Sequence, residues 1–408
     1  MASLRPDTPQ QAAEAVAWAA AEQQPLEVVA GGSKRGIGRP LQVEYVLDTS
    51  ALAGISDYEP AELVLTAGAA TKLAEIEARL AEHKQMLTFE PPDLRALLGA
   101  EDKEQTIGGV LACNLAGPRR PKAGAARDHL LGFHAVNGRG ELFKSGGKVV
   151  KNVTGYDLSK LVAGSWGTLA VLTEVSVKVL PRAETGNTVL LLGLKDRDAI
   201  RALTHGLNSE HEVSGAAHLP ERLAARSEVE AVAGARLAVT ALRLEGPAPS
   251  VAYRAQALRD SLSEYGRTEL LAADDTERLW HEIRDVKPLT EPRERPVWRI
   301  SVPPASGPAV AAAISDELDC ALFYDWGGGL IWAAVADNIE DAGAGAIRRA
   351  IGLHGGGHGT LIRGSTGLRA SIPVFEPLPD PLAALTARVK GSFDPRKVLN
   401  PGRMYAGL

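Results

Sequence analysis

Cysteine is scarce in this sequence. The 408 residues contain two cysteines, Cys113 and Cys320, which lie far apart and form no C-x-x-C pair. Two isolated thiols exclude a disulfide scaffold, a cysteine-ligated zinc site and an iron–sulfur cluster held by this chain alone. We therefore expect a reducing compartment, both thiols as small buried apolar groups, and no bound metal.

Long apolar runs and a large net charge are also missing. The longest runs, such as VLLLGL at 189–194, are far too short to cross a bilayer. The N-terminal region has no basic segment followed by an apolar one, so no export signal is visible. A net charge of -5 argues against a nucleic-acid partner. We expect a cytoplasmic protein that reaches a membrane only through a partner.

Glycine is plentiful, and its first cluster poses a choice between two cofactor loops. AGGSKRGIG at 30–38 has the glycine spacing of a short-chain dehydrogenase, and Tyr156 and Lys160 match the second half of that signature. A nicotinamide-binding loop must open a helix, however, and here Pro40 and a β-rich stretch follow. A tyrosine four residues before a lysine also arises by chance.

A loop between two strands suits the first glycine cluster better. Such a loop can hold a diphosphate through its backbone N–H groups, with Lys34 and Arg35 adding positive charge. A tight turn that merely requires glycine is the alternative.

The first part of the chain alternates helices and strands. We expect helices at 8–23 and 72–85, strands at 26–30, 41–55 and 167–181, hairpins at 55–71 and 129–147, and a glycine-rich loop at 106–124.

After Pro181 the pattern changes to two similar units. Each reads strand, helix, strand, strand, helix, over 188–262 and again over 297–355. This order predicts a second domain with an antiparallel sheet covered by helices. The charged, proline-containing link at 283–296 is expected to be a surface connection, from which Arg284 could reach a site between domains.

Several strings together carry a family resemblance. They are VVAGGSKRG, EPPD, TIGGVLACNLAGPRR, RDHLLGF, GGKVVKNVTGYDLSKLVAGSWGTLAVLTEV and a closing FDPRKVLNPGRM. Their order resembles the vanillyl-alcohol-oxidase, or PCMH-type, FAD proteins, and within them the FAD-binding subunits of glycolate oxidase (GlcE type). The match is close over residues 8–182 and the C-terminal tail and looser between them.

The resemblance implies an α+β fold with a PCMH-type, two-subdomain FAD domain at 1–182, a cap domain at 183–375, and a segment at 376–408 that returns to the FAD domain. It implies that one loop wraps the FAD pyrophosphate, namely Ala30, Gly31, Gly32, Ser33, Lys34, Arg35 and Gly36. It implies that the flavin is lined by Pro91, Thr106, Ile107, Gly108, Gly109, Asn114, Gly117 and Gly124. It also implies that the adenine end lies beside Gly167, Val171 and Leu172. Ser33 and Lys34 stand where family members with covalent FAD carry histidine, so noncovalent FAD is expected.

The catalytic residues are less well defined. Oxidation of a 2-hydroxy acid needs a cation for the carboxylate and a base for the hydroxyl proton. Related dehydrogenases carry an H-x-G-D-G-N-x-H-like stretch, whereas this chain has HGGGHGTLIR at 354–363, which we expect to be a glycine turn with partly exposed histidines. The candidates are Arg284, Arg363 and His358, with Arg299 and Trp326 on a possible substrate wall. Surface ion pairing explains isolated arginines equally well.

A basic run follows the central glycine-rich segment. Its members Arg119, Arg120, Lys122 and Arg127 are expected in a solvated loop, from which they could attract FAD or dock a partner.

The resemblance implies a complex with a second flavin subunit and an iron–sulfur subunit that oxidises glycolate, a small 2-hydroxy acid, to glyoxylate. Two other functions remain open at this stage. One is a self-sufficient FAD-dependent D-2-hydroxy-acid dehydrogenase, and the other is a flavin-free subunit that assembles the complex.

Overall fold

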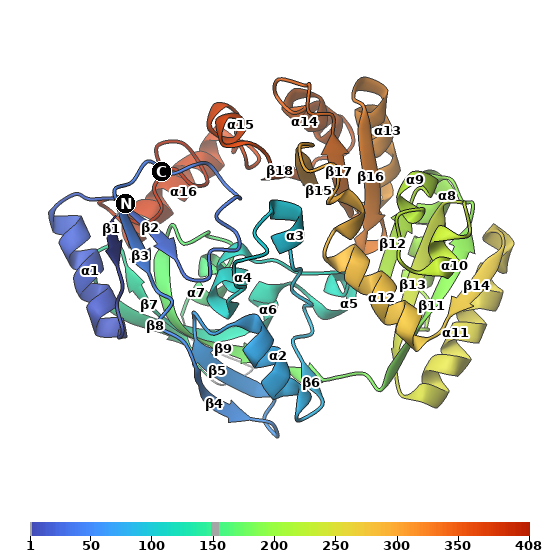
Figure 1. Cartoon of the computed structure of the whole chain (residues 1–408), viewed down its shortest axis with the longest axis horizontal. Coiled ribbons are helices and arrows are strands. Elements are labelled where there is room, and N and C mark those ends of the chain that lie inside the picture. Colours follow the sequence, from blue (N-terminus) through green and yellow to red (C-terminus); the bar gives the residue numbers. More distant parts are fainter. Residues whose placement is uncertain (1, 148–154) are drawn as a thin grey trace.

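The computed structural model describes residues 2–147 and 155–408. A small parallel sheet stands at one end of the molecule, with α1 packed against it (Figure 1). The Thr8 hydroxyl begins this helix by accepting a hydrogen bond from the Gln11 N–H. Its buried face is made of small side chains, which let the helix approach the sheet closely. The elements are β1 (Ala2–Leu4), α1 (Pro9–Ala21), β2 (Leu26–Val29) and β3 (Tyr45–Asp48).

A five-stranded antiparallel sheet forms the rest of the first part, in the order β4-β5-β9-β7-β8. Alternating apolar residues of its strands pack against α2 and α4 in one core. A two-stranded pair of β6 with β10 lies beside it. The bounds are β4 (Ile55–Glu59), β5 (Val64–Gly68), α2 (Leu73–Ala81), β6 (Gln85–Met86), α3 (Arg95–Leu98), α4 (Ile107–Cys113), α5 (Arg120–Ala123), α6 (Ala126–His129), β7 (Leu130–Asn137), β8 (Leu142–Gly146), α7 (Leu158–Val162), β9 (Ala170–Lys178) and β10 (Leu180–Pro181).

The expected loop at 106–124 is wrong in part, because it contains α4 and α5. Thr106 caps α4, since its hydroxyl accepts the Gly109 N–H. Gly108 lies so close to the Ala69 carbonyl oxygen that a Cβ there would come within 2.7 Å of it. Glycine has a low helix propensity, so the local sequence disfavours a helix here. The helix forms because its glycines allow it to pack closely against Ala69.

The predicted antiparallel sheet is confirmed in the second part, with eight strands in the order β14-β11-β13-β12-β16-β17-β15-β18. Each of the two predicted units ends in one more strand, β14 or β18, so each is β-α-β-β-α-β. The units join where His218 pairs with Tyr324. The strands are β11 (Thr185–Leu192), β12 (Gly215–Leu219), β13 (Val239–Gly246), β14 (Thr268–Leu271), β15 (Val297–Ser301), β16 (Cys320–Asp325), β17 (Leu330–Val335) and β18 (His358–Arg363).

Most of the longer helices cover one face of this large sheet, whereas Trp280 packs against Thr188 and Arg243 on the face turned to the first part of the chain (Figure 1). The expected surface link at 283–296 is wrong in part, because Val286 and Leu289 are buried in the core. The helices are α8 (Asp196–Leu207), α9 (Glu221–Ala224), α10 (Glu230–Ala233), α11 (Ala248–Leu262), α12 (Ala273–Arg284), α13 (Gly307–Glu317) and α14 (Ala344–Leu353), with short 3-10 turns η1 (Ser263–Tyr265), η2 (Lys287–Leu289), η3 (Pro304–Ser306) and η4 (Trp326–Gly328).

The C-terminal segment comes back to the first part, and the two termini lie near each other (Figure 1). It contains α15 (Thr366–Ser371) and α16 (Asp380–Phe393), after which Leu399 forms a bridge with Leu26 of β2. Among the helices of the described residues, none has the length and apolar character to span a bilayer.

A buried ion-pair network joins the two parts. Arg243 of β13 contacts Glu90, and Arg119 contacts Glu245 at 2.7 Å. The expectation of a solvated basic loop is therefore wrong for Arg119, whose side chain is 17% exposed. The other members of the run are exposed, as expected: Arg120, Lys122 and Arg127.

Candidate cofactor-binding site

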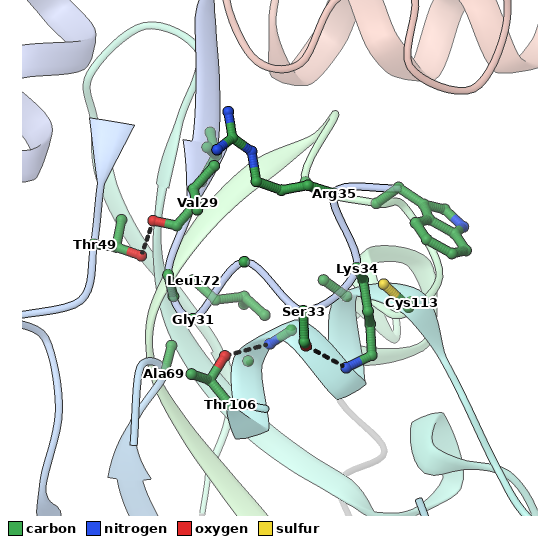
Figure 2. Close-up of a pocket in the computed structure, with 18 of the residues that line it drawn as sticks. Val29, Gly31, Ser33, Lys34, Arg35, Thr49, Ala69, Thr106, Cys113 and Leu172 are labelled. Atoms are coloured by element: carbon green, nitrogen blue, oxygen red, sulfur yellow. Dashed lines mark hydrogen bonds between the residues drawn. The ribbon is translucent and has the colours of Figure 1, made fainter. Parts of the chain in front are cut away.

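A pocket lies between the loop after β2 and the start of α4 (Figure 2), and residues of the C-terminal tail also line it. Three segments that are far apart in the sequence therefore build one site. Its lining consists of Val28, Val29, Ala30, Gly31, Gly32, Ser33, Lys34, Arg35, Thr49, Ala69, Glu104, Thr106, Gly108, Gly109, Ala112, Cys113, Trp166, Gly167, Ala170, Leu172, Asn400 and Arg403.

The first glycine cluster forms a loop between β2 and β3, as predicted, and no helix follows it. Gly31 must lack a side chain, because a Cβ there would come within 2.1 Å of the Glu104 carbonyl oxygen. Gly32 has a positive φ of 75°. Within the described residues, the backbone N–H groups of Gly31 and Lys34 donate no hydrogen bond. Such N–H groups are suited to the oxygens of a diphosphate.

Lys34 brings a buried positive charge to this loop. Its ammonium donates to the Gln105 side-chain oxygen at 2.9 Å and to the Ser33 hydroxyl at 3.3 Å. Burial lowers the pKa of Lys34, since no carboxylate of the described residues forms an ion pair with it. Arg35, in contrast, is already bonded to Glu27. Lys34 is thus the cation of this loop that remains available to an anion.

The opposite wall of the pocket is largely apolar. Ala69 and Leu172 line it, and the N-terminal turn of α4 lies beside them (Figure 2). Ala112 is part of the same lining. Cys113 also faces the pocket, and burial raises the pKa of its thiol to about 11. The thiol is therefore protonated at neutral pH. A glycine loop with free N–H groups, one available cation and an apolar wall fit a dinucleotide such as FAD, which has a diphosphate and flat ring systems.

Two residues of the C-terminal tail complete the site and were missed as site residues. The Asn400 side chain accepts the Val28 N–H at 2.8 Å and donates to the Trp166 carbonyl at 2.9 Å. Arg403 donates to the Lys34 carbonyl at 3.0 Å. The closing string FDPRKVLNPGRM includes both residues and is one of the strings that carry the family resemblance. It could therefore have indicated that the tail contributes to the site.

Eleven of the eighteen predicted cofactor residues line this pocket. The structure brings together Ala30, Gly31, Gly32, Ser33, Lys34, Arg35, Thr106, Gly108, Gly109, Gly167 and Leu172. The other seven lie outside the lining: Gly36, Pro91, Ile107, Asn114, Gly117, Gly124 and Val171.

Each of these seven has another setting. Ile107 and Val171 are buried in two hydrophobic cores. Asn114 ends α4 in a left-handed conformation, and its side chain accepts the Arg127 N–H. The remaining four have distinct neighbours: Pro91 lines a smaller cavity with Arg284, Gly36 lies near Leu98, Gly117 accepts a hydrogen bond from Trp326, and Gly124 packs against Asp128.

Arg363, a catalytic candidate, is fully engaged elsewhere. Its five N–H groups donate to five backbone carbonyls, so none remains for a substrate. Burial lowers the pKa of this guanidinium to about 10. The prediction of a substrate-binding Arg363 is therefore wrong, because the side chain ties the link at 283–296 to β18. The carbonyls belong to Leu97, Leu289, Thr290, Pro292 and Arg295.

The other two candidates remain accessible. Arg284 pairs with Asp285 at 2.7 Å and lines the small cavity that also contains Pro91. His358 begins β18, so the expected glycine turn covers only the residues before it. Desolvation, with repulsion from Arg299, lowers the pKa of His358, and its imidazole is neutral at neutral pH.

The dehydrogenase-like pair lies outside the pocket. Tyr156 is 93% exposed, and Lys160 pairs with Asp157 at 2.9 Å. The string KNVTGYDLSKL begins in 148–154, and these positions lie outside the described residues. Among the residues that the structure describes, no group of three or more His, Cys, Asp or Glu side chains is arranged to hold a metal ion.

Comparison with known proteins decides the family. A family model described as an FAD binding domain matches residues 2–146. The chain is 34% identical over 396 residues to the glycolate oxidase subunit GlcE of Escherichia coli, which covers 97% of each chain. The chain belongs to the GlcE family. The predicted resemblance is thus confirmed, and FAD is the cofactor of the domain that holds the pocket.

Two further relatives extend the comparison. The glycolate oxidase subunit GlcD of Bacillus subtilis is 42% identical over 104 residues, which cover 26% of this chain and 21% of GlcD. The solved structure of p-cresol methylhydroxylase with substrate bound superposes with a TM-score of 0.71 at 12% identity, covering 99% of this chain and 88% of that one. This likeness confirms the predicted α+β, PCMH-type fold.

Proposed function

We propose that this chain is the FAD-binding subunit of a glycolate oxidase complex and supports oxidation of glycolate to glyoxylate. The observation that carries the proposal is the convergence of the glycine loop, α4 and the C-terminal tail on one pocket, in a chain related over its whole length to GlcE. We further propose the division into an FAD domain at 1–182, a cap at 183–375 and a returning segment at 376–408.

FAD is held noncovalently in this proposal. Among the described residues of the pocket lining there is no histidine, and the Cys113 thiol stays protonated, so neither kind of nucleophile is positioned and activated for attachment. The N–H groups of Gly31 and Lys34 and the Lys34 ammonium would hold the pyrophosphate. Bound FAD would accept the hydride from the substrate carbon.

Of the original candidates, His358 suits the proton transfer. A neutral imidazole can take the hydroxyl proton of a 2-hydroxy acid, and its ring makes no hydrogen bond among the described residues. Arg284 stays protonated and is therefore a candidate for the cation that binds the substrate carboxylate, because it lies at the small cavity between the two parts.

Electrons must then leave through another subunit. Two separate cysteines cannot hold an iron–sulfur cluster, so we propose an iron–sulfur partner beside a GlcD-type second flavin subunit. Any membrane association would go through these partners.

Reconstitution tests the proposal. Co-expression with a GlcD-type subunit and an iron–sulfur subunit should give glycolate-dependent reduction of an artificial acceptor that omission of this chain abolishes. Bleaching of the isolated FAD-loaded chain by glycolate or D-lactate would favour the self-sufficient dehydrogenase. A colourless chain that never takes up FAD but is still required for assembly would leave only the assembly function.

A further inference from the structure

One face of the large sheet carries polar side chains toward the first part of the chain. Directly paired residues of neighbouring strands share a face, and Arg299 pairs with Thr360 while Ser301 pairs with His358. The opposite face holds Trp298, whose ring contacts Arg348 of α14. The polar face is therefore the one that the helices α13 and α14 leave uncovered.

Two arginines meet on this face over a single indole ring. The guanidinium of Arg299 lies 4.9 Å from the ring centre of Trp326, and that of Arg120 from α5 lies 4.4 Å from it. The indole Nε1 donates to the Gly117 carbonyl at 3.0 Å, which fixes the ring between the two parts of the chain. A guanidinium stacked on a ring keeps its N–H edge free to bind a carboxylate.

Neither arginine is neutralised within the protein. Among residues 2–147 and 155–408, the side chains of Arg299 and Arg120 form no ion pair and no hydrogen bond. The acid that acts electrostatically on Arg299 is Asp325, whose carboxyl accepts the Trp326 backbone N–H at 2.7 Å. Burial raises the pKa of Asp325 to about 7, so this carboxyl is only partly charged at neutral pH. Burial, together with repulsion from the exposed Arg120, lowers the pKa of Arg299 to about 10.

The arginine pair also lies near the cofactor pocket. Cys113 lines that pocket, and Gly117, which holds Trp326, is four residues further along the chain. Four residues span at most about 14 Å. A short segment thus connects the pocket wall to Trp326, and the polar sheet face that carries Arg299 also carries His358.

We propose that Arg299 and Arg120, held over Trp326, form a binding site for a small carboxylate anion at the junction of the two parts. The assignment of this anion to the 2-hydroxy acids rests on the proposed function. The anion site itself rests on the unpaired arginines.

Oxalate, a dicarboxylate that cannot donate a hydride as glycolate does, is the probe. Calorimetric titration of the full-length chain, with and without FAD, should show one site. Arg299→Gln and Arg120→Gln should each weaken oxalate binding at least tenfold, whereas the control Arg278→Gln, which removes an exposed arginine paired with Asp275, should change it less than twofold. Thermal unfolding should show that Arg299→Gln is at least as stable as the original chain, since it removes an unpaired charge.

Three results would overturn the inference. The first is oxalate affinity within twofold of the original chain in both arginine variants. The second is a loss of FAD affinity in these variants, which would mean that the arginines hold the cofactor. The third is absent oxalate binding together with weakened capture of the GlcD-type subunit, which would make the pair a protein contact. Failure of the proposed function would appear separately, as no glycolate-dependent acceptor reduction despite arginine-dependent oxalate binding.

Discussion

Arg243 and Glu90 connect the two parts of the chain through two hydrogen bonds, each 2.9 Å long. Both side chains are almost fully buried. Although burial acts in the opposite direction, Arg243 and Arg119 lower the pKa of Glu90. The Glu90 carboxylate therefore remains charged inside the protein. Both arginines stabilise this charge.

Removal of this carboxylate should destabilise the chain. Glu90→Gln leaves the buried Arg243 and Arg119 to share the single carboxylate of Glu245, and breaking such a buried network costs about 3–5 kcal/mol. Chemical denaturation at pH 7 should show this decrease. The matched control Glu212→Gln breaks an exposed pair with Lys122 and should cost less than about 1 kcal/mol. Equal effects of the two substitutions would mean that the buried network contributes no special stability.

Asp325 should make the protein less stable as the pH rises. Its folded-state pKa of about 7 lies above the ordinary value of 3.8, so between these values the folded state binds more protons than the unfolded state. Stability from this group is thus present below about pH 4 and is lost as the pH rises through 7. Asp325→Asn keeps an oxygen that can accept the Trp326 N–H. The substitution should raise the free energy of unfolding by about 2–4 kcal/mol at pH 8 and change it little at pH 4. A gain that is independent of pH would contradict this account.

Lys34 should contribute directly to FAD affinity. Hydrogen bonds to charged groups contribute about 1.5–3 kcal/mol, so Lys34→Met should weaken FAD binding by about ten- to a hundredfold. Titration of the FAD-free chain, followed by flavin fluorescence, measures this. Lys72→Met, at an exposed lysine paired with Glu104, serves as the control. Unchanged affinity in Lys34→Met would place the pyrophosphate elsewhere.

Gly31 and Gly36 offer a matched pair within one loop. Gly31→Ala should abolish FAD binding, because the new Cβ would meet the Glu104 carbonyl and displace the loop. At Gly36 the nearest atom to a Cβ is 3.9 Å away, so Gly36→Ala should bind FAD within about threefold of the original chain. Circular dichroism should confirm that both variants fold. Loss of binding in both would mean that contact with Glu104 does not explain the requirement for glycine at position 31.

Local sequence patterns were sufficient for much of the fold. The two repeated units and the glycine loop followed by a strand are as predicted, since alternating apolar residues and a proline encode them locally. α4 was missed because Gly108 and Gly109 suggest a loop, whereas tertiary contact with Ala69 favours the helix. β18 was missed for a related reason, since the glycines before it hid a strand that is stabilised by pairing with β15.

The site was only partly predictable for a different reason. Residues 30–35 are contiguous, so a single motif revealed them. Asn400 and Arg403 reach the pocket from the far end of the chain. No local sequence pattern predicts their contacts with Val28 and Lys34. Arg363 and Arg299 look alike in sequence, yet one is surrounded by carbonyls and the other is unpaired. Only the three-dimensional structure separates a structural arginine from one that is free to bind an anion.

The central claim is that this chain by itself binds one FAD, noncovalently, in the pocket between the glycine loop and α4. The most direct test is to incubate the purified chain with FAD, remove free cofactor by gel filtration, precipitate the protein with acid and measure flavin in the supernatant. We predict a yellow protein that releases one FAD per chain, and no flavin with Gly31→Ala. A chain that stays colourless, or a flavin that remains with the precipitated protein, would contradict the account.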